Sequence, residues 1–297
     1  MSDTATISRP TEDRPIKVRR ISFDYPADEL PRHYMADDLV MSHIVSVLSG
    51  LFPEGEDFFV RTVRNYRDRI TDPELKAQVA GFIGQEATHG REHRAFNDRL
   101  AELGYPTKLV DRFTRARLRM NEKTLPQTWQ LAITAALEHY TATLAEALLS
   151  DPEARAMFST DEVRSLLLWH AVEESEHKAV AFDVYQEVCG NARLRGNVMN
   201  AVTVGFLTTS VAFAAFSLLR DPASRDLRRL GRSLRRVRSS PWLTKDVRRR
   251  IRDYNRPDFH PNDHDATELL AEWRERLFGT EGTLVDHLDG GRRAVAS

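Results

Sequence analysis

Residues 169–185 read WHAVEESEHKAVAFDVY, and this stretch decides the fold. Residues three and four apart lie above one another on one face of a helix. One such stripe is apolar at both ends and polar in its middle, and its members are Val163, Leu167, His170, Glu174, His177, Ala181, Val184 and Val188. Burying imidazole and carboxylate groups is costly unless a strong partner compensates them. A metal ion is such a partner, so the stretch predicts a helix that presents ligands inside a bundle.

Two earlier segments show the same pattern. In FPEGEDFF, residues 52–59, Glu56 is in phase with Phe59 and Val63, whereas the rival acid Glu54 is not. We expect Pro53 and Gly55 to break or kink the helix that begins near residue 36. The next helix starts with Asp72 as its N-cap and Pro73 in the first turn, and it ends near Gly104. Its apolar stripe carries Glu86, His89 and His93 at its centre.

The remaining helices complete the set. Residues 105–126 predict a short charged helix between two prolines, which we expect to cross over on the outside of the bundle. Residues 127–150 carry Glu138 on a stripe of alanines. These small side chains either leave space beside the metals for oxygen and a substrate or allow close helix packing. The last helix should open with a capping box of Ser159 and Glu162 and end near Gly190.

These four stripes predict an all-α fold, an antiparallel four-helix bundle with a long crossover and a C-terminal helical extension. The order Glu, Glu-x-x-His, Glu, Glu-x-x-His is typical of bundles that hold two metal ions, and here it comprises Glu56, Glu86 with His89, Glu138, and Glu174 with His177. The alternative is four solvated faces, but solvated acids should lie opposite an apolar stripe rather than inside it. The expected organisation is an arm at 1–35, the bundle at 36–190, an apolar helix with a basic extension at 191–280, and a tail at 281–297.

Composition limits which metals and which cellular compartment the sequence favours. The chain has 297 residues, 29% of them charged, with a net charge of −1 and one cysteine. A single cysteine argues against a disulfide framework and a thiolate cluster. Carboxylate and imidazole ligands favour two iron ions, with manganese or a mixed Mn/Fe pair as alternatives. The polar N-terminus lacks the apolar core of a secretory signal, so we expect the cytoplasm, including the inner face of the membrane.

The phrases FPEGEDFF, FIGQEATHGREH, LEHYTATLAEALL, WHAVEESEHKAVAFDVY and YNRPDFHP resemble a bacterial family known as predicted metal-dependent hydrolases, from about residue 19 to 280. Residues 36–190 also resemble the ferritin-like di-iron carboxylate superfamily. A third resemblance rests on the pattern His-x-x-x-Glu-x-x-His, which is similar to that of the p-aminobenzoate N-oxygenase type of di-iron enzyme. It implies that His170 is a third imidazole ligand, beside Glu56, Glu86, His89, Glu138, Glu174 and His177.

Three other polar residues are candidates for supporting these ligands from behind. His93 lies one turn beyond His89 on the same stripe, and we favour a supporting role for it over that of an eighth ligand. His139 and Glu173 lie beside the central stripes, where they could support a ligand or face solvent.

The segment Gly196–Leu219 is an uncharged run of 24 residues, long enough to span a bilayer, although its Asn, Ser and Thr residues also suit a buried or homodimer-interface helix. Residues 220–252 then contain thirteen Arg or Lys and three Asp. Such a basic tract beside an apolar helix favours an anionic membrane surface as a partner of residues 196–252. Sparse aromatic residues argue against nucleic acid.

The leading functional expectation is a di-iron oxygenase or oxidase that uses O2 to oxidise a small organic substrate, for which the apolar run suggests a hydrophobic molecule. The first alternative is a metal-dependent hydrolase, in which two ions lower the pKa of bound water. The second is an iron-handling protein with ferroxidase activity. The residues assign no catalytic group beyond the ligands.

Overall fold

The computed structural model describes residues 16–26 and 30–288, and this part of the chain is helical apart from loops and one isolated β-bridge between Ile21 and Leu288. The prediction of an all-α bundle is confirmed. The α-helices are α1 (Leu39–Arg64), α2 (Pro73–Glu102), α3 (Thr107–Thr124), α4 (Gln127–Ser150), α5 (Pro152–Ala156), α6 (Asp161–His177), α7 (Val180–Val188), α8 (Ala192–Leu219), α9 (Leu227–Arg238), α10 (Lys245–Asp253) and α11 (Thr267–Phe278). Short 3-10 turns are η1 (Pro222–Arg225), η2 (Pro241–Leu243), η3 (Pro261–Asp263) and η4 (Val285–His287).

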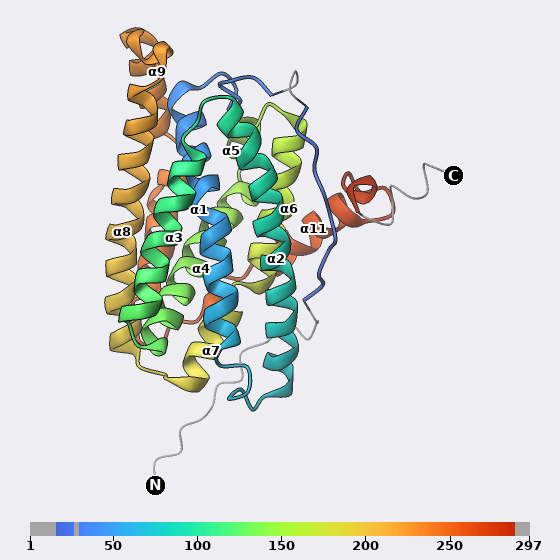
Figure 1. Cartoon of the computed structure of the whole chain (residues 1–297). Coiled ribbons are helices and arrows are strands. Elements are labelled where there is room, and N and C mark those ends of the chain that lie inside the picture. Colours follow the sequence, from blue (N-terminus) through green and yellow to red (C-terminus); the bar gives the residue numbers. More distant parts are fainter. Residues whose placement is uncertain (1–15, 27–29, 289–297) are drawn as a thin grey trace.

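The bundle is formed by α1, α2, α4 and the consecutive helices α6 and α7 (Figure 1). α1 packs along α2, and α4 packs along α6 and α7. α3, the expected crossover, lies against α1 on the outside, and α8 covers α1 and α4. Two large apolar clusters fill the interior, one around Trp169 and Phe96 and the other around Phe58 and Phe82. The polar centre described below therefore has apolar layers on both sides.

α1 runs unbroken through Pro53, so the expected break there is wrong. A proline inside a helix leaves the carbonyl four residues earlier without its hydrogen-bond donor. That carbonyl belongs to Ser49, and the side-chain amide of Asn97 on α2 donates to it over 2.8 Å. The neighbouring helix thus satisfies the group that proline frees, and Glu56 stays in phase with the rest of α1.

Most other helix ends follow their sequence signals. Asp72 accepts a hydrogen bond from the backbone of Glu74, and Gly104 has the positive φ of 89° that ends α2. The expected capping box is wrong, because the Ser159 hydroxyl donates to the carbonyl of Tyr34 instead. The last bundle helix is also divided: α6 ends at His177, and a turn precedes α7.

The chain beyond α8 wraps the bundle. α9 packs on α1, α10 on α4, and α11 on α6 and α4. On the other side, residues 16–26 lie along α2 and α6, where Gly81 and Gly84 allow Ile16 and Val18 to approach the α2 backbone closely. Of the expected arm and tail, residues 1–15, 27–29 and 289–297 lie outside the described residues; the described end of the chain, residues 281–288, carries η4 and the bridge to Ile21.

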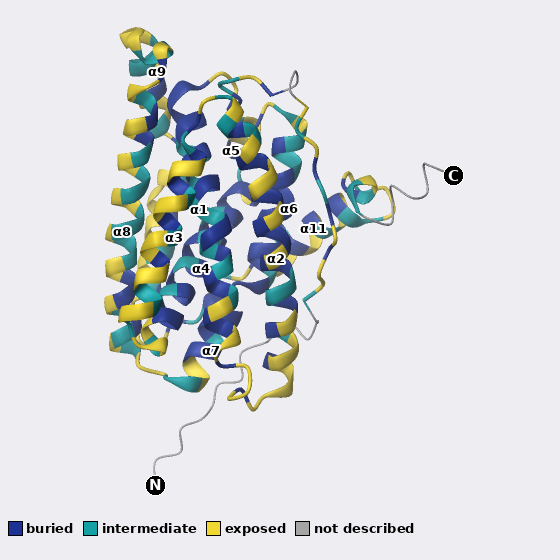
Figure 2. Cartoon of the chain, in the orientation of Figure 1, coloured by how far each residue is buried: buried dark blue, intermediate teal, exposed yellow. Residues whose placement is uncertain are grey.

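α8 is unusually exposed for an apolar helix. Within the described residues it is the one helix long and apolar enough to cross a membrane, and only 11% of its most apolar window is buried. Figure 2 shows its outer side as exposed and intermediate along most of its length. Length and composition alone are weak evidence for a membrane span, but α8 is clearly not a core helix.

Candidate metal centre

Four helices bring the seven predicted ligand side chains together at the middle of the bundle. α1 supplies Glu56, α2 supplies Glu86 and His89, α4 supplies Glu138, and α6 supplies His170, Glu174 and His177. None of the seven residues is more than 4% exposed. Within α2 and within α6 the ligands are three or four residues apart, so the side chains of each helix project from one face toward the same point. The stripes read from the sequence thus converge in space.

One half of the centre surrounds His177. Its Nε2 lies 3.0 Å from Glu86 Oε1, 3.4 Å from Glu138 Oε2 and 3.8 Å from Glu174 Oε1. The contact with Glu86 is short, yet its geometry is not that of a hydrogen bond. One ligand atom each of Glu86, Glu138 and His177 lie within 4.8 Å of one another, which is a spacing that one metal ion can bridge.

The other half surrounds His89 and His170. His89 Nδ1 lies 3.5 Å from Glu174 Oε1 and 3.7 Å from Glu86 Oε1. His170 Nε2 lies 2.8 Å from the same Glu174 oxygen and 3.8 Å from Glu56 Oε1. Glu86 belongs to the metal-sized groups of both halves, with Glu56 and His89 in one and with Glu138 and His177 in the other. Its carboxylate is therefore placed to bridge two ions.

Unsatisfied polar atoms test whether these residues fit a metal. Buried polar atoms nearly always have a hydrogen-bond partner. Nine buried atoms of the centre have none among the described residues: both carboxylate oxygens of Glu56, Glu86 and Glu138, together with Glu174 Oε2, His89 Nδ1 and His177 Nε2. Without a cation this cluster would be strongly destabilising. The donor set, four carboxylates and three imidazoles, fits one or two hard or borderline divalent ions.

Supporting residues fix which nitrogen of each imidazole faces the centre. His89 Nε2 lies 3.1 Å from Glu173 Oε2, and Arg19 from the N-terminal segment holds the other oxygen of Glu173 at 3.0 Å. His177 Nδ1 lies 2.8 Å from Gln85 Oε1. In the neutral form each ring donates outward to an oxygen, so its other nitrogen can offer a lone pair to a metal ion at the centre.

The third imidazole is supported by another histidine. His170 Nδ1 lies 2.7 Å from His93 Nε2, and His93 Nδ1 lies 2.9 Å from the hydroxyl of Ser49. Hydrogens on both Nδ1 atoms give a continuous chain toward Ser49 and leave the lone pair of His170 Nε2 facing the carboxylates. His93 also forms a metal-sized group with Glu56 and His170. His93 therefore contacts His170, and its role as a supporting residue rather than an eighth ligand stays a prediction.

The charges of the centre depend strongly on one another. Burial, followed by repulsion from Glu86, raises the pKa of Glu138 to about 8 and that of Glu56 well above its usual value. Burial alone would lower the pKa of His89, but its contacts with the carboxylates of Glu173 and Glu174 raise it to about 10. An imidazolium therefore balances the carboxylates in the metal-free chain, and a metal ion would take over this role.

The other two supporting candidates differ. Glu173 contacts His89 as described, whereas His139 points away from the centre, and its Nε2 bonds the carbonyl of Arg250 over 2.9 Å. His139 lies off the stripe of α4, on the side covered by α10, and this position explains the difference. Sequence reasoning missed Gln85 and Arg19. Gln85 precedes a ligand directly, but only the fold brings Arg19 to Glu173.

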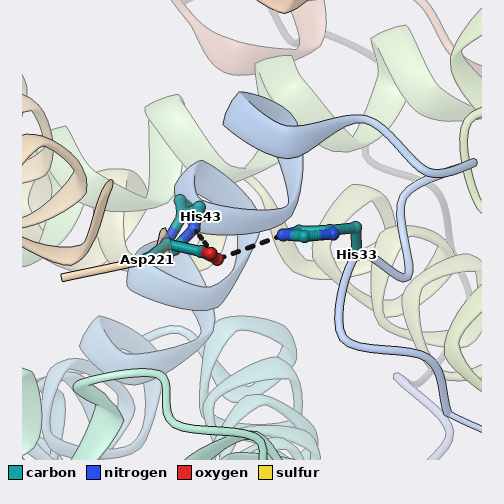
Figure 3. A group of neighbouring side chains, drawn as sticks. All are labelled: His33, His43 and Asp221. Carbon is teal, nitrogen blue, oxygen red and sulfur yellow. Dashed lines mark hydrogen bonds and ion pairs between the residues drawn. The ribbon is translucent and has the colours of Figure 1, made fainter. Parts of the chain in front are cut away.

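A second group of ligand-type side chains comes from the segment before α1, from α1 itself and from the turn between α8 and η1 (Figure 3). His33 Nε2 and His43 Nε2 both lie 3.1 Å from Asp221 Oδ2. Arg229 donates to His33 Nδ1, so in the neutral ring Nε2 carries the hydrogen and donates to Asp221. Arg32 binds the same oxygen. These side chains therefore hydrogen-bond one another and the neighbouring arginines, and their lone pairs already accept hydrogen bonds.

A cavity of about 580 Å³ reaches the centre from the opposite side, and His170 and Glu174 form part of its wall. The rest of the lining is mostly apolar and comes from α1, α3, α4 and α8. The carboxylate–imidazole cluster is thus buried on the side of the N-terminal segment and accessible from the cavity.

The model of a family described as "predicted metal-dependent hydrolase" matches residues 17–265. Searches of curated proteins and of solved structures found no match. The family match covers the bundle, α8 and the extension through α10, and it confirms the first of the three resemblances.

The expected di-iron oxygenase function is wrong on this finding, because the matching family is described as hydrolases and the match favours hydrolysis at a metal centre. The role proposed for O2 as a substrate falls with it. The comparisons do not support the resemblance to di-iron oxygenases, and they establish metal dependence without identifying the metal.

Proposed function

The chain belongs to the family of predicted metal-dependent hydrolases, and we propose that its buried Glu/His centre holds the metal that this hydrolysis requires. The observation that supports this most is the set of nine unpaired polar atoms that the centre aims at one space. The residues that would hold the metal are Glu56, Glu86, His89, Glu138, His170, Glu174 and His177. Bound there, divalent ions supply the usual chemistry of a hydrolytic metal site: they acidify water and polarise the bond to be cleaved.

The chain's own residues have separate tasks in this function. Glu173 and Gln85 hold His89 and His177 so that their lone pairs face the centre. Arg19 holds Glu173 in turn, which links the N-terminal segment to the metal site. The apolar cavity wall beside His170 and Glu174 excludes bulk water and admits the substrate from one side.

The test compares neighbouring residues of α4. Glu138→Gln removes a carboxylate of the centre, whereas His139→Gln alters the next residue, which faces Arg250. Protein loaded with Zn²⁺ is assayed without oxygen against aryl esters, amides and phosphoesters, in water enriched in ¹⁸O. We expect turnover with ¹⁸O in the product for the wild type and His139→Gln, and at least a 100-fold loss in Glu138→Gln.

Two results would refute the proposal. One is stoichiometric metal binding without hydrolysis of any of these substrate classes. The other is equal turnover in Glu138→Gln and the wild type, which would place the reaction elsewhere in the chain.

A further inference from the structure

The lining of the cavity beside the metal centre extends along much of the bundle. Along α4 its lining extends from Trp129 to Leu148, which corresponds to about 28 Å at the 1.5 Å rise of an α-helix. A lining of this length can accommodate an extended chain.

The cavity wall is mostly apolar. Leucine, isoleucine, valine and aromatic side chains of α1, α4 and α8 form most of it, and examples are Leu48, Ile133, Leu144, Val198 and Phe206. Such a surface gains free energy when it contacts methylene groups and offers few partners to a polar chain.

Two polar residues of the wall belong to the candidate metal centre. His170 and Glu174 are on the wall, and the ring of Phe52 packs against His170 with its centroid 5.0 Å away. Glu138, at mid-height on α4, lies between the cavity residues Leu137 and Thr141 in sequence. A chain lying in the cavity therefore passes the metal-ligand cluster.

We propose that the substrate is a long-chain acyl ester whose alkyl chain occupies this cavity and whose carbonyl lies beside His170 and Glu174. This proposal rests on the hydrolytic function proposed above. In the reaction, water adds to the acyl carbon, the bond from that carbon to the ester oxygen breaks, and the products are a fatty acid and an alcohol. Water supplies the hydroxyl of the acid and the proton of the alcohol.

Two glycines provide matched variants. Gly55 lines the cavity on α1, and among the described residues an added Cβ would meet the ring of Phe59 at an ordinary contact distance of 3.9 Å, so Gly55→Leu places a larger side chain at the cavity wall. At Gly231 on α9, no atom of the described residues lies within 4 Å of an added Cβ, and Gly231 is not part of the cavity lining, so Gly231→Leu is the control. Both changes replace a helical glycine, which favours folding.

The binding experiment uses metal-free protein and the saturated fatty acids from C8 to C18, measured by calorimetry. We expect the Kd to fall about fourfold per added methylene until the cavity is full. Gly55→Leu should raise the Kd of the longest acids at least about tenfold, and Gly231→Leu should not change it. A Kd independent of chain length, or equal effects of the two variants, would overturn the proposal.

Activity separates this proposal from the function on which it rests. Zn²⁺-loaded protein that cleaves short and long p-nitrophenyl esters equally well is a hydrolase, but it refutes the long-chain substrate. If binding depends on chain length but no ester is cleaved, the long-chain ligand of the cavity is supported and the hydrolytic function is refuted.

A separate observation concerns the outer face of α8. Val204, Leu207, Val211 and Leu219 recur at helical spacing on this face, and all are exposed, Val211 by 67%. A solvent-facing apolar stripe of this length is rare on a soluble protein and marks an interaction surface. The following helix α9 has the sequence LRRLGRSLRRVR, with six arginines and no acid.

We infer that this face of α8 rests on an anionic lipid surface. The positive charge of α9 favours a lipid surface over a second copy of the chain. The arginines next to the apolar stripe complement anionic head groups, whereas a second copy would bring its own arginines, which would repel them. The occupant is therefore a bilayer rather than another protomer.

Vesicle co-sedimentation tests this inference with full-length protein and phosphatidylglycerol or phosphatidylcholine vesicles. We expect binding to the anionic vesicles only, lost in Val211→Glu and weakened about thirtyfold in the double variant Arg232→Glu/Arg235→Glu. Val18→Glu, on the N-terminal segment across the bundle from α8 (Figure 1), is the control and should bind as the wild type does. No binding to either vesicle, equal binding to both, or a dimer that Val211→Glu dissociates would overturn the inference.

Discussion

Glu173→Gln tests the centre through a residue that is not itself a proposed ligand. Glu173 is fully buried, and its two oxygens serve different partners: Oε2 accepts from His89 Nε2 and Oε1 accepts from Arg19. A glutamine keeps the size of the side chain but has one acceptor oxygen and one NH2 donor. Either Arg19 or His89 must then face a donor group. In both cases His89 is held less firmly. The negative charge of Glu173, which makes the His89 ring a stronger ligand, is also lost.

The expected loss follows from the role of such outward hydrogen bonds. Removing the group that orients a ligating histidine typically costs 10- to 100-fold in metal affinity, about 1.4 to 2.7 kcal/mol. Because contacts with the carboxylates of Glu173 and Glu174 raise the pKa of His89 to about 10, against the opposing effect of burial, the loss of the Glu173 charge should also lower this pKa. The variant should therefore bind metal more weakly and release fewer protons when it does so.

The assay is competition between metal-free protein and a chromophoric chelator for Zn²⁺ and Mn²⁺. Glu92→Gln is the matched control. Glu92 lies on α2 and is buried like Glu173, but it accepts a hydrogen bond from the backbone of Phe23 rather than from an imidazole. Denaturant unfolding of both metal-free variants separates a ligand effect from a folding defect. If Glu173→Gln binds both ions within twofold of the wild type while Glu92→Gln behaves as expected, His89 is not a ligand held by Glu173.

Three further predictions concern stability. Metal-free Glu56→Gln should be about 1–2 kcal/mol more stable than metal-free wild type in urea, since burial, followed by repulsion from Glu86, raises the pKa of Glu56, and added metal should stabilise the variant less. Burial lowers the pKa of His43 from 6.5 to about 4, so its contribution is complete above pH 6.5 and is lost as the pH falls to 4; over this range the wild type should lose about 3 kcal/mol more stability than His43→Gln. Asn97→Ala leaves the buried Ser49 carbonyl without its donor and should lower the free energy of unfolding by about 1–3 kcal/mol; an unchanged value would mean that water replaces the amide.

The sequence pattern was sufficient to predict features that depend on the residues of a single helix. α4 begins and ends at the residues expected, Gln127 and Ser150, because prolines and an apolar stripe define it. The convergence of Glu56, Glu86 and Glu138 was also accessible, since an acid centred in an apolar stripe must face the interior of a bundle.

What the sequence could not reveal depends on partners far along the chain. α1 continues past Pro53 because Asn97, on another helix, satisfies the carbonyl of Ser49. Glu173 and His139 both lie beside the central stripes, yet Glu173 reaches His89 while His139 faces α10. No local rule distinguishes these two residues, because what distinguishes them is which element covers each side of the bundle.

The arrangement also separates two properties that a hydrolase must combine. All seven residues of the candidate centre lie on α1, α2, α4 and α6, and none lies on α8. The cavity, in contrast, takes much of its wall from α3 and α8. Side chains such as Val202 and Phe206 can therefore change the length or shape of the cavity without moving a ligand. Related chains with the same carboxylate–histidine cluster and a different α8 should then share their metal chemistry and differ in the substrates that they accept.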